Sequence, residues 1–374
     1  MVSKADNSVR FCIDYREINK ATAFDAEPIP DIEEILCQLS KGKYFVKIDL
    51  TKGYWQLPMD PVDREKTAFQ TSFGLFQWTR MPFGLQNAPA TFARTMRALK
   101  LQECGAVSFF DDIIQAPKSW EELLVLLHAV LQRLRVFGLT ARPSKMHIGF
   151  QELEFLGHTL AVGIMKPEKS KVQKILSLKQ PTTKKQVRSI LGLLSYYRRY
   201  VPHFAALTDP LTDLTKGSSS KHIKWTDECQ KALEHIQHIL NSFPVLLLPS
   251  LSEPFVLRTD ASSTGLGAVL LQQKREQLHP VQYASKKLTT AQQKYSTVER
   301  ECLAIVWGCD KFARFLVGRK FTLQTDHKPL TFLHAAKTKN NRLLRWALSL
   351  QEYKFVVEPV PGTANVFADL LSRS

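Results

Sequence analysis

The sequence contains no long apolar run. No stretch approaches the roughly twenty consecutive apolar residues that cross a bilayer, and residues Met1–Asp6 lack the apolar core of a secretory signal. The sequence therefore excludes a membrane partner and predicts an intracellular protein.

Cysteine is also scarce. The six cysteines lie far apart, and none belongs to a C-x-x-C pair or to a Cys/His cluster with zinc spacing. This pattern excludes a structural zinc site and predicts reduced thiols. Cys302 and Cys309 fall one heptad apart on a predicted helix, which favours core residues over metal ligands. No internal repeat with a period of about 20 to 50 residues is evident.

Acidic residues are in the minority. Lys and Arg number 51 against 35 Asp and Glu, which gives a net charge of +16 and a pI near 9.5. Such a surplus favours a polyanionic partner, above all nucleic acid, although basic residues can also serve solubility alone. The length of 374 residues predicts two or three domains, and 44% hydrophobic residues suffice for well-formed cores.

Two adjacent acids stand out against this background. Asp111 and Asp112 lie between short apolar runs in Val107–Ile114, a pattern typical of a β-hairpin. Neighbouring side chains in a strand face opposite sides of the sheet, so the two carboxylates can act together only at or beside the turn. Such a tip suits a divalent cation. A solvated turn is the plainer interpretation of the pair when it is considered alone.

Two further motifs change that interpretation. The β-rich run Tyr44–Leu50 contains Asp49 and is followed by Gly53-Tyr54, and Met81–Phe92 combines Pro and Gly with small residues that let another chain approach. The order IDL(TK)GY, MPFGLQNAPATF and FxDD resembles the palm of a reverse transcriptase, specifically that of gypsy-type LTR retrotransposons.

The resemblance implies a role for each acid of the palm. Asp49 and Asp111 would bridge two Mg²⁺ ions about 4 Å apart, with Mn²⁺ as an alternative metal. Asp112 would support them, while the primer 3′ hydroxyl attacks the α-phosphate in line. Without metal, the clustered acids would repel one another.

The same resemblance implies that four residues bind the incoming nucleotide. Arg10 would grip the triphosphate, and Lys145 could protonate the pyrophosphate leaving group, with an unmatched surface charge as the alternative for each. Tyr54 would lie under the sugar and exclude a 2′-hydroxyl, although it could also be a packing residue. Phe83, from the MPFG motif, completes the set.

Primer and duplex contacts are expected from three segments. Phe109 stands where most relatives have Tyr, so we expect reduced activity with the ring retained. Gly157 and His158 belong to a segment resembling the primer-grip turn, although a turn glycine with an exposed histidine would look the same. The run LGLLSYYRRYVPHF resembles the gypsy-type thumb, which favours duplex backbone contact by Arg198 or Arg199.

A second acidic constellation follows a proline-bounded passage at Pro244–Pro254. Two predicted strands end identically in Thr-Asp, and a capping box at Ser296-x-x-Glu299 opens a helix. The segments TDASSTGLGAVL, ERECLAIVWG, TDHKPL and ANVFADLLSR resemble a retrotransposon RNase H domain, whose four metal-binding carboxylates would be Asp260, Glu301, Asp326 and Asp369. Water would replace the primer hydroxyl as nucleophile, and the 2′-hydroxyl of RNA would be required.

We therefore predict an α/β (α+β) fold, a right-hand polymerase palm and fingers with thumb-connection, followed by an RNase H-like mixed-sheet domain. The expected domains are 1–150 (fingers and palm), 151–252 (thumb/connection) and 253–374 (RNase H-like). Relatives carry more fingers sequence upstream, so we expect the chain to start inside the fingers. A second capping box is predicted at Thr183 and Gln186.

The predicted activity is RNA-directed DNA polymerisation with RNase H cleavage. Its partners would be an RNA template, a DNA primer, RNA–DNA hybrid and dNTPs. No protease or integrase motif is visible, so other parts of a Pol polyprotein are further expected partners. Family resemblance implies the cytoplasm or a virus-like particle, with the nucleus as an alternative.

Two competing interpretations remain open at the sequence level. A decayed or domesticated element product would bind nucleic acid without catalysis; the short fingers favour this, and the complete set of seven carboxylates opposes it. A nuclease-only protein would keep its palm as a scaffold. Separate loss of polymerisation and hybrid cleavage in Asp111→Asn and Asp326→Asn would show that both sites work.

Overall fold

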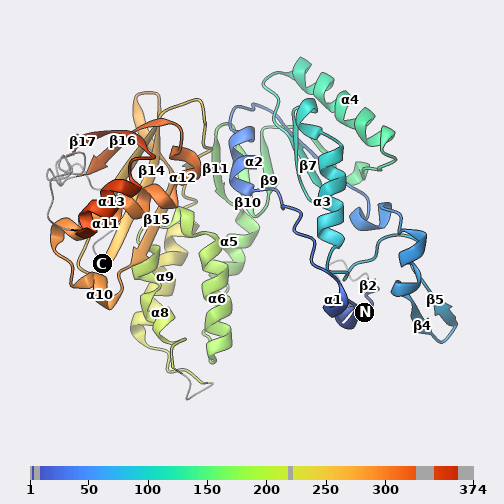
Figure 1. The fold of residues 1–374 in the computed structure, drawn as a ribbon, viewed down its shortest axis with the longest axis horizontal. Coiled ribbons are helices and arrows are strands. Elements are labelled where there is room, and N and C mark those ends of the chain that lie inside the picture. Colours follow the sequence, from blue (N-terminus) through green and yellow to red (C-terminus); the bar gives the residue numbers. More distant parts are fainter. Residues whose placement is uncertain (1, 4–8, 218–221, 326–340, 361–374) are drawn as a thin grey trace. The chain divides into compact units, whose positions relative to one another are not determined.

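The computed structural model describes residues 2–3, 9–217, 222–325 and 341–360, with side chains from Phe11 onward (Figure 1). The chain divides into two compact units. The first comprises Met1–Leu153 with Ala161–Gly163, and the second comprises Glu154–Leu160 with Ile164–Ser374. Each unit is described by itself.

The first unit is built on a four-stranded antiparallel sheet of order β6-β7-β3-β8. In β3, Val46 and Ile48 are fully buried, whereas Lys47 and Asp49 on the opposite face are only partly buried. This alternation follows from the period of two in a strand, and it leaves one sheet face free for polar groups. The strands are β3 (Phe45–Asp49), β6 (Ala106–Phe109), β7 (Asp112–Gln115) and β8 (His147–Phe150).

Helices cover the apolar face of this sheet. Helix α3 (Ala88–Ala98) contributes Phe92, and α4 (Trp120–Val136) contributes Leu123 and Val130, to one buried cluster with Val46, Ile48 and Ile113. This cluster packs on one face of the sheet, and on the other face Phe45 and Ile114 are also buried. The smaller elements are α1 (Arg16–Ala21), α2 (Ile32–Leu39), and the strand pairs β1 (Val2–Ser3) with β2 (Val9–Arg10) and β4 (Phe69–Thr71) with β5 (Gly74–Phe76).

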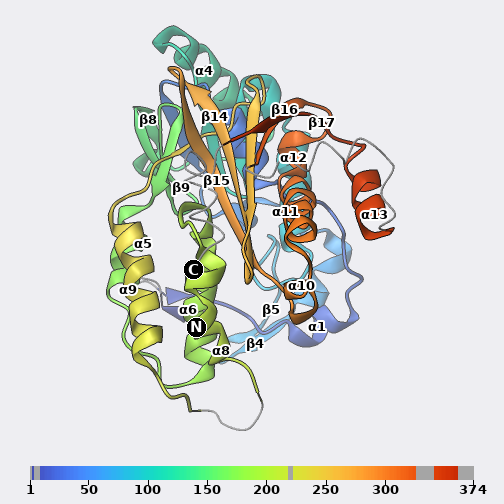
Figure 2. The ribbon, with the colours of Figure 1, turned by 90° about the vertical axis from the view of Figure 1, so that its left-hand side faces the viewer.

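The second unit begins with a sheet of order β12-β11-β10-β9 and a group of helices. The predicted capping box is present at the start of α6, where Thr183 and Gln186 satisfy each other's backbone groups. Figure 2 shows α5, α6, α8 and α9 as the helical part of this unit. The elements are β9 (Glu152–Phe155), β10 (His158–Ala161), β11 (Ile164–Pro167), β12 (Leu246–Leu247), α5 (Lys169–Leu176), α6 (Lys184–Tyr196), α7 (Phe204–Leu207), α8 (Asp209–Asp213) and α9 (Asp227–Asn241).

The rest of the second unit is a mixed five-stranded sheet of order β15-β14-β13-β16-β17. Strands β13, β16 and β17 run parallel, whereas β14 and β15 are antiparallel to their neighbours. The elements are β13 (Phe255–Ala261), β14 (Gly265–Lys274), β15 (Gln277–Lys287), β16 (Lys320–Thr325), β17 (Lys354–Pro359), α10 (Thr290–Gln293), α11 (Thr297–Lys311), α12 (Ala313–Leu316) and α13 (Asn341–Ser349).

Helix α11 packs closely on this mixed sheet. A Cβ at Gly308 would lie 2.9 Å from the Thr259 Cγ2 of β13, so only glycine allows the approach. The predicted capping box at Ser296 and Glu299 is present. Cys302 and Cys309 are buried, and burial raises the pKa of each thiol to about 12, which confirms them as core residues. Among the described residues, no helix has both the length and the apolar character that a membrane crossing requires.

Candidate active sites

Three carboxylates meet at one end of the first sheet. Asp49 ends β3 and lies directly opposite Asp112, the first residue of β7. Asp111 occupies the turn between β6 and β7 after Phe110, whose φ of +51° is left-handed. The backbone N–H of Leu50 donates to the Asp111 carbonyl at 3.1 Å, which ties this turn to the end of β3. The register between neighbouring strands therefore brings the three predicted acids together.

Two lysines neutralise part of this negative charge. Lys47 Nζ lies 3.2 Å from Asp112 Oδ2, and Lys145 Nζ lies 3.5 Å from Asp49 Oδ2. Burial raises the pKa of Asp112; Lys47 opposes the shift, whereas the charges of Asp111 and Asp49 add to it. The three acids are thus close enough to repel one another, as expected for a cation site.

The donor set suits a hard divalent cation. Among the described residues, no group of three His, Cys, Asp or Glu side chains is arranged to hold a metal ion by itself. Mg²⁺, however, usually takes one or two carboxylates and completes its shell with water and substrate phosphate oxygens. Asp49 and Asp111 with an incoming triphosphate fit that requirement.

Aromatic side chains line the neighbouring space. Tyr54 lies in the 3-10 helix η1 (Gly53–Gln56), and its ring centroid is 5.2 Å from that of Phe83 and 5.3 Å from that of Phe92. Burial, and then the negative charge of Asp111, raise the pKa of the Tyr54 hydroxyl. Tyr54 therefore lies near Asp111, and Phe83 packs against Tyr54. The backbone of Arg10 belongs to β2, but its side chain lies outside the described residues.

Phe109 keeps a ring near the acidic turn. It is the last residue of β6, and its ring packs edge-on against Phe110 at 5.0 Å between centroids. Both rings are only partly buried. An aromatic surface therefore adjoins the carboxylates even without the hydroxyl that a tyrosine would bring.

Two predicted primer and duplex contacts are corrected in the second unit. The side chain of His158 is buried, with its Nδ1 2.9 Å from the Tyr200 hydroxyl, and burial lowers its pKa to about 4. Arg199 is also buried, with its Nη1 3.8 Å from Met165 Sδ. Neither side chain can reach a duplex, because the end of α6 packs onto the sheet that carries His158.

Arg198 has a structural contact instead. Its guanidinium donates to the Ser285 carbonyl at 3.0 Å and lies 5.8 Å from the Phe204 ring centroid. Burial lowers the pKa of Arg198. This arginine therefore links the segment after α6 to β15, and its contact with a duplex stays a prediction.

The second acidic site is described in part. Asp260 lies on β13 and Glu301 on α11, and they are 4% and 5% exposed. The close packing of α11 on β13 positions both carboxylates. Asp326 and Asp369 lie outside the described residues.

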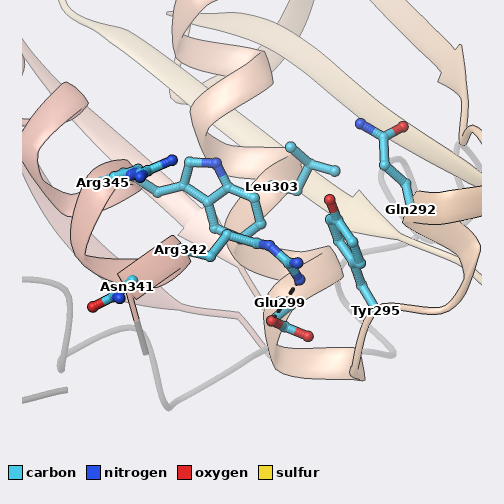
Figure 3. A pocket seen from close by; sticks show the side chains of 8 residues that line it. Gln292, Tyr295, Glu299, Leu303, Asn341, Arg342 and Arg345 are labelled. Carbon is cyan, nitrogen blue, oxygen red and sulfur yellow. Dashed lines mark hydrogen bonds and ion pairs between the residues drawn. The ribbon is translucent and has the colours of Figure 1, made fainter. Parts of the chain in front are cut away.

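A cavity of about 700 Å³ between α10, α11 and α13 was not predicted (Figure 3). The Arg342 guanidinium lies 4.0 Å from the Tyr295 ring centroid and pairs with Glu299 at 2.8 Å. The i, i+3 and i+4 spacing of Arg342, Arg345 and Trp346 could have indicated one wall. The Lys47–Asp112 ion pair was also missed, although Lys47 and Asp49 share a strand face.

Comparison with known proteins agrees with this architecture. Residues 2–160 match the family described as "Reverse transcriptase (RNA-dependent DNA polymerase)", and residues 250–353 match "RNase H-like domain found in reverse transcriptase". A foamy viral protease-reverse transcriptase in complex with dsDNA is 26% identical, with a TM-score of 0.88 over 96% of this chain and 76% of that chain. The same kind of protein in complex with RNA/DNA hybrid is 26% identical, with a TM-score of 0.80 over 94% and 49%.

Curated relatives extend the match over nearly the whole chain. The "Retrovirus-related Pol polyprotein from transposon 297" of Drosophila melanogaster is 40% identical over 98% of this chain, and that from transposon gypsy, of the same organism, is 36% identical over 97%. The chain spans about a third of the length of these relatives, 34% and 36% respectively.

A palm sheet with three carboxylates followed by a mixed five-stranded sheet defines a reverse transcriptase fold with an RNase H-like domain, which confirms the predicted fold class. The chain belongs to the Pol family of gypsy-type LTR retrotransposons, which confirms the resemblance drawn from its motifs.

Proposed function

We propose that this chain is an RNA-directed DNA polymerase with RNase H activity. It extends a DNA primer on an RNA template and cleaves the RNA strand of the resulting RNA–DNA hybrid. The observation that carries the proposal is the meeting of Asp49, Asp111 and Asp112 at one sheet end, beside Tyr54.

At the polymerase site the carboxylates hold the reacting groups. Asp49 and Asp111 are the metal ligands, and Asp112, paired to Lys47, supports them. Mg²⁺, with Mn²⁺ as an alternative, neutralises charge at the attacking and leaving oxygens when it is bound. The primer 3′ hydroxyl attacks the α-phosphate of a dNTP. Lys145 carries a proton on Nζ that it can give to the leaving pyrophosphate.

The nucleotide is selected by neighbouring side chains. Tyr54, held by Phe83 and Phe92, lies under the sugar and excludes a 2′-hydroxyl. Arg10 grips the triphosphate. The Phe109 ring supports the primer end, and the turn at Leu156 and Gly157 holds that end through its backbone.

The second site cleaves RNA. Asp260, Glu301, Asp326 and Asp369 are its metal-binding acids, and water is the nucleophile. The RNA–DNA hybrid in a structural relative supports the same substrate class for this chain. Affinity should come from phosphate contacts and fall steeply with salt.

These roles map onto three proposed domains: 1–150 as fingers and palm, 151–252 as thumb/connection and 253–374 as RNase H-like. The relatives are polyproteins, which supports other parts of a Pol polyprotein as further partners. The proposed location is intracellular, in the cytoplasm or a virus-like particle, with the nucleus as an alternative.

Primer extension on an RNA template with Mg²⁺ tests the proposal, run beside cleavage of a labelled RNA–DNA hybrid. Extension by the wild type that disappears in Asp111→Asn would establish the polymerase. A wild type that cuts hybrid but never extends would reduce the function to a nuclease. A wild type that binds hybrid without either reaction would make the chain a non-catalytic binding protein.

A further inference from the structure

The turn between β9 and β10 has an unusual backbone. Its two residues, Leu156 and Gly157, have φ angles of +46° and +72°, both in the left-handed region. Two-residue hairpin turns of this kind favour Asn, Asp or Gly at both positions. A leucine there is strained, so surrounding contacts must hold the conformation.

Two tyrosine hydroxyls supply such contacts. The Tyr196 hydroxyl donates to the Leu156 carbonyl, and the Tyr197 hydroxyl donates to the Gly157 carbonyl at 3.0 Å. The backbone N–H of Glu168 donates to the same Gly157 carbonyl at 3.0 Å. Tyr196 and Tyr197, two consecutive residues at the end of α6, therefore donate hydrogen bonds to the two consecutive carbonyls of the turn.

Both hydroxyls can donate at neutral pH, because an ordinary tyrosine keeps its proton up to about pH 10. Burial raises the pKa of Tyr196 and Tyr197 further. The turn is also tightly enclosed, because a Cβ at Gly157 would lie 3.1 Å from Tyr196 Cε1 and from the Tyr197 hydroxyl. The contact therefore requires glycine at this position.

His158 packs against the same tyrosine side chains. Its buried ring stacks on Tyr196 with 5.4 Å between centroids and 11° between planes, and its Nδ1 meets the Tyr200 hydroxyl. Tyr196 nevertheless remains 44% exposed. A phenylalanine would serve packing equally well, so the hydroxyl contact points to control of the turn.

We propose that Tyr196 and Tyr197 are positioning residues that lock the Leu156–Gly157 turn in the conformation that holds the primer end. This inference rests on the proposed function, because it assumes that the turn grips a primer. All of these residues belong to the second unit, so the contacts that hold the turn are internal to that unit.

The test combines Tyr196→Phe and Tyr197→Phe, which remove only two oxygen atoms. We expect KM for the primer–template to rise about tenfold, as loss of hydrogen bonds to the turn predicts. KM for dNTP and the rate of hybrid cleavage should stay within about twofold. Tyr353→Phe is the matched control, since it removes the hydroxyl of another buried tyrosine of the same unit, outside the turn.

Two further measurements separate positioning from general stability. Hydrogen exchange at the amides of residues 155–159 should accelerate about tenfold in the double variant, with other amides of the unit unchanged. Adding Leu156→Asn creates an Asn-Gly turn that favours the same conformation unaided, so it should restore KM. A merely structural role would give neither a local exchange change nor this rescue.

The outcomes distinguish the inference from the proposed function. If the wild type never extends a primer, the proposed function fails. Hydrogen exchange at residues 155–159, together with the Kd for a labelled primer–template duplex, then tests whether the two tyrosines position the turn. Faster exchange with weaker duplex binding would support it. Unchanged exchange at the turn, or an unchanged KM and Kd, would overturn the inference.

Discussion

The two acidic sites of this chain are assembled differently. Asp49 and Asp112 stand on the neighbouring strands β3 and β7 and keep 23% and 26% of their side-chain surface exposed, and Asp111 stands in the turn between β6 and β7. Asp260 and Glu301 come from a strand and a helix, and both are nearly fully buried. The proposed polymerase site therefore depends on strand register, whereas the proposed nuclease site depends on the packing of α11 against β13.

The largest expected effect is the loss of primer extension, with hybrid cleavage retained, when an acid of the first sheet is changed. Asp49→Asn should lower primer extension by about a thousandfold or more, because it removes a charge that stabilises the transition state. Hybrid cleavage should stay within about twofold. Glu65→Gln, an exposed acid in the same unit, is the control for both assays. Parallel loss of both reactions would break the separation.

The second prediction concerns Glu301 in the second acidic site. Glu301→Gln should lower hybrid cleavage by about a hundredfold or more and leave primer extension unchanged. The exposed Glu276, in the turn between β14 and β15, provides the control Glu276→Gln. Cleavage at the wild-type rate would remove Glu301 from the nuclease site.

The third prediction concerns the 2′-hydroxyl, which the palm should reject and the nuclease should require. Tyr54→Val removes the ring that packs on Phe83 and Phe92. We expect incorporation of ribonucleotides relative to deoxyribonucleotides to rise about 10- to 100-fold, measured as a ratio of kcat/KM values. The preference of the nuclease for RNA should not move. An unchanged incorporation ratio would assign Tyr54 to packing.

The smallest expected effect is a pH dependence confined to the second unit. The pKa of His158 is lowered by burial from 6.5 to about 4, so the folded state binds fewer protons than the unfolded state. Above about pH 6.5 the histidine is neutral in both states and costs no stability. As pH falls from 6.5 toward about 4, the unfolded state binds a proton that the folded state does not, so the free energy of unfolding falls by roughly 1 kcal/mol per pH unit.

Urea unfolding at several pH values between about 7 and 5 measures this slope. The wild type should lose free energy of unfolding relative to His158→Gln as pH falls. Parallel stability profiles for the two proteins would show that the histidine titrates alike in the folded and unfolded states.

The palm could be predicted from sequence because its signals are local. Asp49, Asp111 and Asp112 stand at strand ends whose pairing follows from one hairpin and one neighbouring strand. The capping boxes at Thr183 and Ser296 were equally local, since each spans four residues.

The errors arose where distant segments pack together. His158 was expected to contact the primer and Arg199 the duplex backbone, yet both side chains are buried within the second unit. Burial of this kind depends on contacts between segments about 40 residues apart, which no periodicity records. The cavity beside Tyr295 and Arg342 was missed for the same reason.

The most direct test of two independent sites is a complementation assay with Asp111→Asn and Asp260→Asn on one labelled primer and RNA template. Each variant alone should perform one reaction: Asp260→Asn extends without cutting, and Asp111→Asn cuts preformed hybrid without extending. Mixing the two should restore extension followed by cleavage. If either variant loses both reactions, or the mixture does not extend the primer and then cleave the RNA, the account of two separate sites is contradicted.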